Sequence, residues 1–195
     1  MCIRDSNHYY DQASSAKRLS LAELVAFSFH VGKPVFSYAS SSAEGNPAPI
    51  AGGHVVDVEV DSETGKVSIL QYTAFQDAGF AVNPSQFEGQ VQGGALQGIG
   101  WALSEEYIFD KHGALQNSNL LDYRMMTSLD VPFIDIHIVE IASAENPFGI
   151  RGAGQVPIIP PAAALANAIY NATGKRIRSL PMNPERIYWE LNPVS

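Results

Sequence analysis

The sequence predicts an α+β fold, in which helices and strands mix without a regular strand–helix–strand repeat. Three observations predict it. Valines alternate with acidic residues just before residue 61, a second alternating run covers residues 134–139, and apolar stretches with helical spacing lie at about 84–105 and 160–172. With 195 residues, of which 46% are apolar and 16% charged, the chain can form one or two domains with a buried core.

The first predicted element is a helix that begins after Ser20 and ends near Pro34. Ser20 and Glu23 have the spacing of a capping box, in which each side chain caps the backbone N–H of the other residue. Residues 37–53 are rich in Ser, Ala, Gly, Asn and Pro, so they predict a loop. Residues 1–18 show no periodicity, and we expect an unstructured or artefactual N-terminal segment there; a natural but frayed terminus is the alternative.

A β-hairpin follows over residues 54–75. Within its first strand the valines share one face and the acidic residues the other, Asp61–Gly65 predicts the turn, and residues 67–75 return. The run at 134–139 predicts another strand. The helix at 160–172 has two prolines in its first turn and is followed by Gly174, which is the usual asymmetry of helix ends.

Composition excludes several classes of protein. No apolar run reaches the roughly 18 residues of a membrane span, and the single cysteine, Cys2, excludes an intramolecular disulfide and a Cys-rich zinc or iron–sulfur site. Residues 1–150 carry 7 Lys and Arg against 18 Asp and Glu, whereas residues 151–195 carry 5 against 2. An acidic body argues against nucleic acid as a partner, because binding phosphates needs clustered cations.

Eight of the 16 glycines lie in two short stretches, 89–100 and 149–154. The five in the first stretch interrupt a helical pattern at about 1 kcal/mol each relative to alanine. Close approach of another helix or of a ligand must offset this cost, and both alternatives stay open. Three amides on the same stretch favour a polar ligand: Gln90, Gln92 and Gln97.

The second glycine stretch belongs to an apolar loop over residues 146–161 that leads into a proline-started helix. Such a loop either presents backbone N–H groups to a polar ligand or only connects elements. Neither stretch is a nucleotide motif. The first lacks the Gly-x-Gly-x-x-Gly order of a dinucleotide fingerprint, and no Gly-Lys-Ser/Thr of a phosphate-binding loop follows.

Five motifs occur in one order along the chain: DVEVDSETG at Asp57–Gly65, DAGFAVNP at Asp77–Pro84, EGQVQGGALQGIGWALSEE at Glu88–Glu106, DYRMMTSLDVP at Asp122–Pro132 and NPFGIRGAG at Asn146–Gly154. Together they resemble the C-terminal part of the molybdenum-binding subunit of the xanthine dehydrogenase/aldehyde oxidase family, within its second molybdopterin-binding domain. The resemblance covers about residues 19–187. We therefore expect residues 19–195 to form part of that domain, truncated at its N-terminus.

This resemblance implies a molybdenum hydroxylase, an oxidoreductase that oxidises aldehydes or N-heterocycles by inserting water-derived oxygen at a molybdenum–pterin centre. Because the pterin holds the metal through its sulfurs, commonly as the cytosine dinucleotide in bacteria, no metal ligand is expected from this chain. An iron–sulfur subunit and an FAD subunit are the expected partners in a hetero-oligomer that acts on a small molecule. The isolated chain is not expected to turn over, and cytoplasmic and periplasmic bacterial locations both stay open.

The resemblance also implies site residues. Gln90 matches the family glutamine beside the pterin, with Gly89 and Gly93 as backbone neighbours. Gln155 stands where the family ordinarily has a glutamate, the general base that takes the proton of the molybdenum-bound hydroxyl. A glutamine amide does not titrate in the useful range. Three explanations stay open: a non-catalytic cofactor-holding paralogue, a subfamily whose amide orients substrate, or a one-nucleotide error in the source sequence.

Other candidates for chemistry are weaker. Arg151, in the second glycine stretch, could contact a substrate carboxylate, although a structural role is the more common outcome. The five histidines are scattered without metal-ligand spacing, so we expect them to face solvent or to be satisfied in the core.

Overall fold

The computed structural model describes residues 2–5, 8–11, 14–34, 49–144 and 146–193. The chain divides into two compact units, Met1–Glu44 and Gly45–Ser195. The first unit holds three antiparallel strands and a helix: β1 (Cys2–Asp5), β2 (His8–Asp11), β3 (Ser14–Ser20) and α1 (Leu21–His30). The predicted capping box is present, because the Ser20 side chain accepts from the Glu23 N–H and the Glu23 carboxylate accepts from the Ser20 N–H.

The structure differs from the unstructured segment expected at residues 1–18, since β1, β2 and most of β3 lie there. Its unit boundary also falls at residue 44 rather than 18. Short strands of polar sequence satisfy their backbone groups by pairing with one another, without the apolar alternation that makes a strand visible in a sequence. The loop predicted at 37–53 lies mostly outside the described residues, and its last two residues begin a strand.

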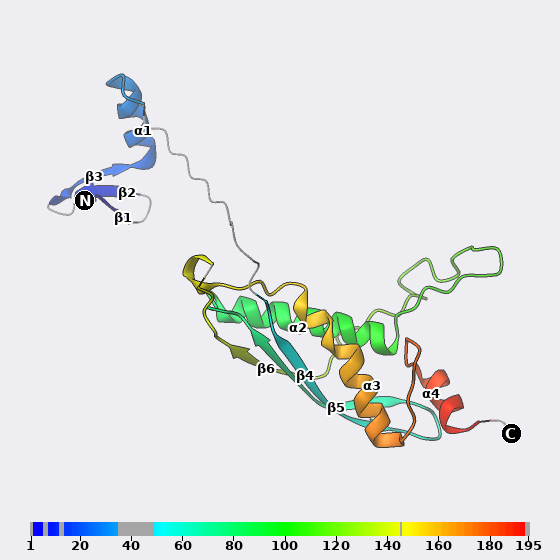
Figure 1. Cartoon of the computed structure of the whole chain (residues 1–195). Coiled ribbons are helices and arrows are strands. Elements are labelled where there is room, and N and C mark those ends of the chain that lie inside the picture. Colours follow the sequence, from blue (N-terminus) through cyan, green and yellow to red (C-terminus); the bar gives the residue numbers. More distant parts are fainter. Residues whose placement is uncertain (1, 6–7, 12–13, 35–48, 145, 194–195) are drawn as a thin grey trace. The chain divides into compact units, whose positions relative to one another are not determined.

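The second unit is built on a three-stranded sheet in the order β4–β5–β6 (Figure 1). The predicted hairpin is confirmed as β4 (Gly52–Val60) and β5 (Val67–Asp77), which pair antiparallel. The predicted third strand is β6 (Ile134–Val139), which pairs with β5 in parallel. A parallel neighbour needs a crossover connection, and this one contains a long helix, α2 (Pro84–Leu103).

A β-bulge in β5 keeps the apolar side chains of that strand on one face. Val67 and Ile69 pack against the core from odd positions, whereas Tyr72 and Ala74 are buried at even positions. The extra residue, Leu70, has no register partner opposite Asp57 and Val58 and is 65% exposed. One unpaired residue changes the phase of the strand, so both halves bury their apolar residues on the same side.

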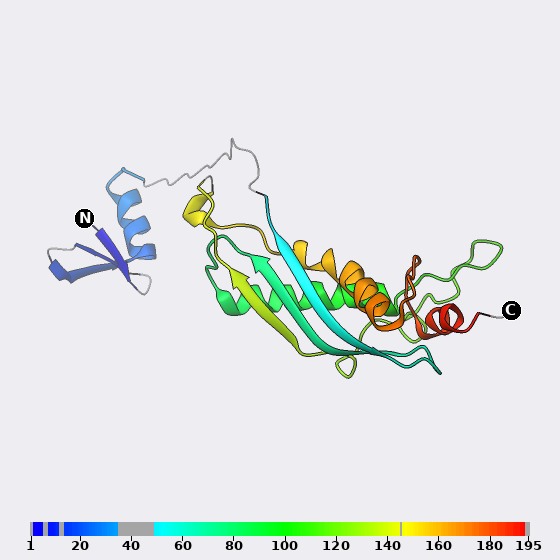
Figure 2. The same cartoon turned by 60° about the horizontal axis from the view of Figure 1, so that its bottom comes forward.

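Two helices cover one face of this sheet, as Figure 2 shows. Helix α2 starts at Asn83, whose side chain caps the Gln86 N–H, and α3 (Pro160–Thr173) ends at Gly174, as the sequence predicted; there the glycine has the left-handed conformation. The core lies between sheet and helices and is made of apolar residues from every element of this layer: Val56, Tyr72, Ala74, Val91, Ala95, Ile99, Ala102, Ile134, Leu165, Ile169, Ile177, Met182 and Ile187.

Three short elements were not expected from the sequence. The turns η1 (Pro147–Gly149) and η2 (Val156–Ile158) lie in the apolar loop over residues 146–161, and α4 (Pro184–Leu191) follows α3. Helix α4 buries Ile187 and packs on the hairpin turn, where a side chain at Gly65 would collide with the carbonyl oxygen of Pro184. Its eight residues are too few for helical periodicity to stand out. None of the described helices is long and apolar enough to cross a membrane.

Glycines 94 and 98 of α2 allow the chain at the start of α3 to pack closely against α2. A Cβ on Gly94 would lie 2.9 Å from Cβ of Pro157, and one on Gly98 would lie 2.6 Å from Cγ of Pro161. The start of α3 therefore rests directly on the bare backbone of α2. Close helix packing accounts for these two glycines.

We expect Gly98→Ala to destabilise the chain by about 1–3 kcal/mol, because the new methyl group has no room against Pro161 and the Ile158 carbonyl. Denaturant unfolding measures the change. The matched control is Gly93→Ala on the same helix, where a Cβ meets nothing within 4 Å. Equal effects of the two substitutions would contradict the close approach.

Candidate functional site

The other two glycines predicted to matter, Gly89 and Gly93, lie on an open side of α2. A Cβ on either would meet nothing within 4 Å, and both residues are exposed. Gln90 and Gln92 are exposed beside them. In the first glycine stretch one pair of glycines thus packs against η2 and the start of α3, and another pair leaves bare backbone next to exposed amides.

The loop that carries Gln155 is brought to the same stretch of α2. Pro157 contacts α2 at Gly94 and Pro161 contacts it at Gly98, so the two segments run in the same direction. Gln155 precedes Pro157 and therefore lies toward the N-terminal half of α2. Gln90 is one helical turn before Gly94, on the same row of positions. Gln155 is thus two residues from a contact with Gly94, and Gln90 is one helical turn from the same glycine.

The amide of Gln155 is not used to hold the loop together. Gln155 is the N-cap residue of η2, yet its side chain makes no capping hydrogen bond and the residue is exposed. No hydrogen bond joins it to Gln90 among the described residues. An exposed amide that the local structure does not consume can both donate to and accept from a ligand.

Residues downstream of Gln155 are held by the end of the sheet. The Val156 side chain would lie 3.4 Å from a Cβ on Gly52, the first residue of β4. That same Cβ would lie 2.8 Å from Oε1 of Gln76, which is fully buried. Gln76 donates weakly from Nε2 to the carbonyls of Ala51 and Asp77, both at 3.4 Å, while its Oε1 has no partner. An orphaned acceptor therefore lies beneath the loop.

Arg151 has a structural role and is not free for a substrate. Its Nε lies 3.2 Å from Oδ2 of Asp77, and the two side chains are 13% and 8% exposed. The guanidinium also donates to the carbonyls of Ile141 and Pro49. The Arg151 guanidinium, which the sequence suggested as a contact for a substrate carboxylate, is thus engaged within the protein. Asp77 was missed, although it opens the DAGFAVNP motif.

A histidine with a lowered pKa, His54, lies elsewhere, on the helix-covered face of β4. His54 Nδ1 and the Tyr72 hydroxyl are 2.7 Å apart, and His54 Nε2 is buried without a partner. Burial lowers the pKa of His54 from 6.5 to about 4 and raises the pKa of Tyr72. His54 thus departs from the expected satisfied or solvent-facing histidine, and it belongs to the core rather than to the candidate site.

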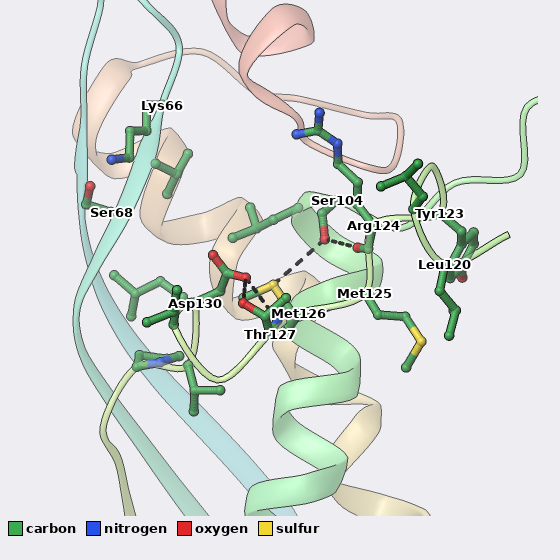
Figure 3. A pocket seen from close by; sticks show the side chains of 17 residues that line it. Lys66, Ser68, Ser104, Leu120, Tyr123, Arg124, Met125, Met126, Thr127 and Asp130 are labelled. Carbon is green, nitrogen blue, oxygen red and sulfur yellow. Dashed lines mark hydrogen bonds between the residues drawn. The ribbon is translucent and has the colours of Figure 1, made fainter. Parts of the chain in front are cut away.

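A pocket of about 860 Å³ is lined by none of the predicted site residues. It opens at the C-terminal end of α2, roughly 20 Å along the helix from Gln90 at 1.5 Å per residue. Figure 3 shows Ser104 donating to the Arg124 carbonyl at 2.9 Å and Asp130 accepting from Thr127 at 2.6 Å. The segment of residues 120–132 that lines the pocket is thus held by hydrogen bonds to Ser104 and within itself. Among the described residues no three His, Cys, Asp or Glu side chains are grouped to hold a metal.

A comparison with protein families shows what this arrangement belongs to. The family described as the molybdopterin cofactor-binding domain matches residues 3–132. The chain belongs to this family. The match begins at residue 3, inside the segment 1–18 that was expected from the sequence to be unstructured or artefactual.

Curated relatives and solved structures agree with this. The putative xanthine dehydrogenase molybdenum-binding subunit XdhA of Escherichia coli K12 is 41% identical over 178 residues, which is 89% of this chain and 24% of that protein. The aldehyde oxidoreductase of Megalodesulfovibrio gigas is 36% identical over 137 residues, 70% of this chain and 15% of that protein. The structure of quinoline 2-oxidoreductase from Pseudomonas putida 86 matches with a TM-score of 0.73 and 29% identity, over 100% of this chain and 26% of that one.

These findings confirm the predicted α+β class and the resemblance to the xanthine dehydrogenase/aldehyde oxidase family. The chain spans about a quarter or less of the relatives that it matches. The open glycine face fits a molybdopterin group, since a flat ligand can approach bare backbone at Gly89 and Gly93 beside two amides.

Gly93→Ala separates stability from ligand binding. We expect it to stabilise the chain by up to about 1 kcal/mol, because alanine is the better helix former and its methyl group enters open space. The same methyl group would occupy the open side of α2 at Gly89 and Gly93, where the cofactor is expected. We therefore expect less molybdenum bound per molecule of the enzyme that contains this chain. Denaturant unfolding and elemental analysis give the two readouts. Unchanged molybdenum content would contradict the proposed role of this face.

His54 should make the chain less stable in acid. Its stabilising contribution is fully present above about pH 6.5 and is lost as the pH falls toward 4, because the unfolded chain then binds a proton that the folded one does not. We expect a loss on the order of 1 kcal/mol, discounted because the residue is only half-buried.

Denaturation midpoints between pH 4.5 and 7.5 measure the effect of His54. The variant His54→Gln should flatten the dependence on pH, whereas His112→Gln, which changes an exposed histidine, should keep the slope of the parent chain. The same slope in His54→Gln would show that another group titrates.

Proposed function

We propose that the chain forms one wall of the molybdenum-cofactor site in a molybdenum hydroxylase that oxidises aldehydes or N-heteroaromatic compounds. The observation that carries this is the open face of α2 at Gly89 and Gly93, beside Gln90, with the Gln155 loop in contact with the same helix at Gly94. We further propose that the chain corresponds to part of the second molybdopterin-binding domain. The relatives support the substrate class, since they carry the names of xanthine, aldehyde and quinoline oxidoreductases.

The proposed roles of the residues follow from their chemistry. Gln90 would hold the polar edge of the pterin through its amide, and the absent side chains of Gly89 and Gly93 would let the group approach the helix backbone. When bound, the cofactor supplies the molybdenum at which a water-derived oxygen is passed to carbon and two electrons are accepted. Gln155 would orient the substrate by donating from its Nε2 and accepting at its Oε1, without taking a proton.

The finer features of the cofactor and the assembly belong to the same proposal. We propose the cytosine dinucleotide form of the cofactor, with iron–sulfur clusters and flavin on partner subunits of a hetero-oligomer. Relatives named as a subunit of a 6-hydroxypseudooxynicotine dehydrogenase complex and as the large subunit of a nicotine 6-hydroxylase support a multi-subunit enzyme.

A second candidate function rests on Gln155 itself. An amide cannot cycle between acid and base, and a positioned general base contributes typically about 10²–10⁴-fold to the rate. A chain that keeps the cofactor face but lacks the base would suit a non-catalytic cofactor-holding subunit.

Restoring a carboxylate at position 155 separates the two functions. In the molybdenum-loaded enzyme that contains this chain, we expect Gln155→Glu to raise kcat per bound molybdenum by about 100-fold or more for aldehydes or N-heterocycles. The control Gln71→Glu adds the same charge at an exposed position on β5. No increase from an active parent would mean that the amide acts in a mechanism without this base. No turnover in either the parent or Gln155→Glu, with molybdenum still bound, would favour the cofactor-holding subunit, and absence of molybdenum from the parent protein would reject both functions.

A further inference from the structure

The ion pair between Asp77 and Arg151 joins two segments that are far apart in the sequence. Asp77 ends β5, and Arg151 lies four residues before Gln155. The Asp77 carboxylate is shared: Oδ1 accepts from the Gly79 N–H at 2.8 Å, and Oδ2 lies 3.2 Å from Nε of Arg151. Both side chains are nearly buried, so this pair differs from the mobile ion pairs of a protein surface.

Backbone hydrogen bonds strengthen the same connection. The Arg151 N–H donates to the Ala78 carbonyl at 2.9 Å, and the Gly149 carbonyl accepts from Phe80 at 3.0 Å and from Ser143 at 3.1 Å. Gly79 has a φ of +64°, and a Cβ there would collide with the Gly149 carbonyl. The turn after β5 and the segment Gly149–Arg151 thus lie against each other, with Arg151 as the charged link.

The loop is therefore held at two places, one on each side of Gln155. Upstream, Arg151 is fixed to Asp77; downstream, Val156 and Pro157 rest against Gly52 and Gly94. Between the two lie Gly152, Ala153 and Gly154, and a Cβ on Gly154 would meet nothing within 4 Å. A short glycine-containing span has little stiffness of its own, so the position of Gln155 depends on both attachments.

We propose that Asp77 and Arg151 are positioning residues that fix the upstream side of the Gln155 loop in its working place. This rests on the proposed function, in which residue 155 faces the cofactor and the substrate. The pair acts through the loop and touches neither cofactor nor substrate. A displacement of a catalytic or substrate-binding group by about 1 Å can lower the rate roughly 100-fold. Loss of the Asp77–Arg151 pair is therefore expected to affect the rate strongly through the position of residue 155.

The test compares Asp77→Asn, Arg151→Gln and Arg151→Lys with the parent protein in the molybdenum-loaded enzyme that contains this chain. Asp135→Asn is the matched control, because it breaks the exposed pair of Asp135 with His137 on β6, whose side chains are 47% and 54% exposed. Amide hydrogen exchange of residues 149–156 reports the loop directly. Kinetics per bound molybdenum report its effect, both with Gln155 and in the Gln155→Glu background.

We expect exchange in residues 149–156 to become at least about 10-fold faster in Asp77→Asn and Arg151→Gln, with α3 unchanged. We expect kcat per bound molybdenum to fall roughly 10–100-fold at constant KM, Arg151→Lys to recover part of the loss, and Asp135→Asn to resemble the parent.

Two results would overturn the proposal. One is faster exchange throughout the second unit with kcat per molybdenum unchanged, which would make the pair a general stabiliser. The other is parent-like exchange of the loop in both Asp77→Asn and Arg151→Gln. If Asp77→Asn does not fold, Arg151→Lys decides between these outcomes, since it keeps the charge and changes only the shape of the donor. If the parent protein holds no molybdenum, the proposed function fails, and the exchange experiment still decides whether the link exists.

Discussion

The second unit depends on the contact between the bare backbone of α2 at Gly94 and Gly98 and two prolines, Pro157 of η2 and Pro161 in the first turn of α3. Pro157 and Pro161 are fully buried there, and no side chain at either glycine would leave room for them. Two glycines in a helix cost about 2 kcal/mol relative to alanines. The contact offsets that cost because it lets α3 and α2 cover the sheet together, with Leu165 and Ile169 buried beneath them. It also fixes the direction in which the chain before α3 must arrive.

That direction determines the rest of the candidate site. Because Pro157 contacts Gly94, the segment before α3 lies against α2, and Gln155 stands two residues upstream of that contact. Upstream, the Asp77–Arg151 pair and the Gly149 carbonyl connect the same loop to the end of β5. The sheet, the long helix and the loop thus meet through backbone contacts, and glycine occupies the positions where two backbones come closest.

The sequence was sufficient for the elements whose signals are local. Alternation gave β4 and β6, the turn at Asp61–Gly65 gave β5 as the returning strand, and the capping residues gave both the start of α1 and the end of α3. It was not sufficient where the cause is tertiary. The bulge at Leu70 depends on which face of β5 is buried, and the burial of His54 depends on the helices that cover it. The pairing of Arg151 with Asp77 spans 74 positions, so no local pattern could predict it.

At the candidate site, too, the roles of the glycines could not be predicted from the sequence alone. Composition could say that something must offset the glycines of α2, but only the structure separates those that contact Pro157 and Pro161 from those that face open space. The ion pair adds a consequence for position 155. Because the Arg151 guanidinium already contacts Asp77 and two carbonyls, it is not available to neutralise a carboxylate four residues later. Arg151 is therefore not the residue that would hold a carboxylate at position 155 in its charged form.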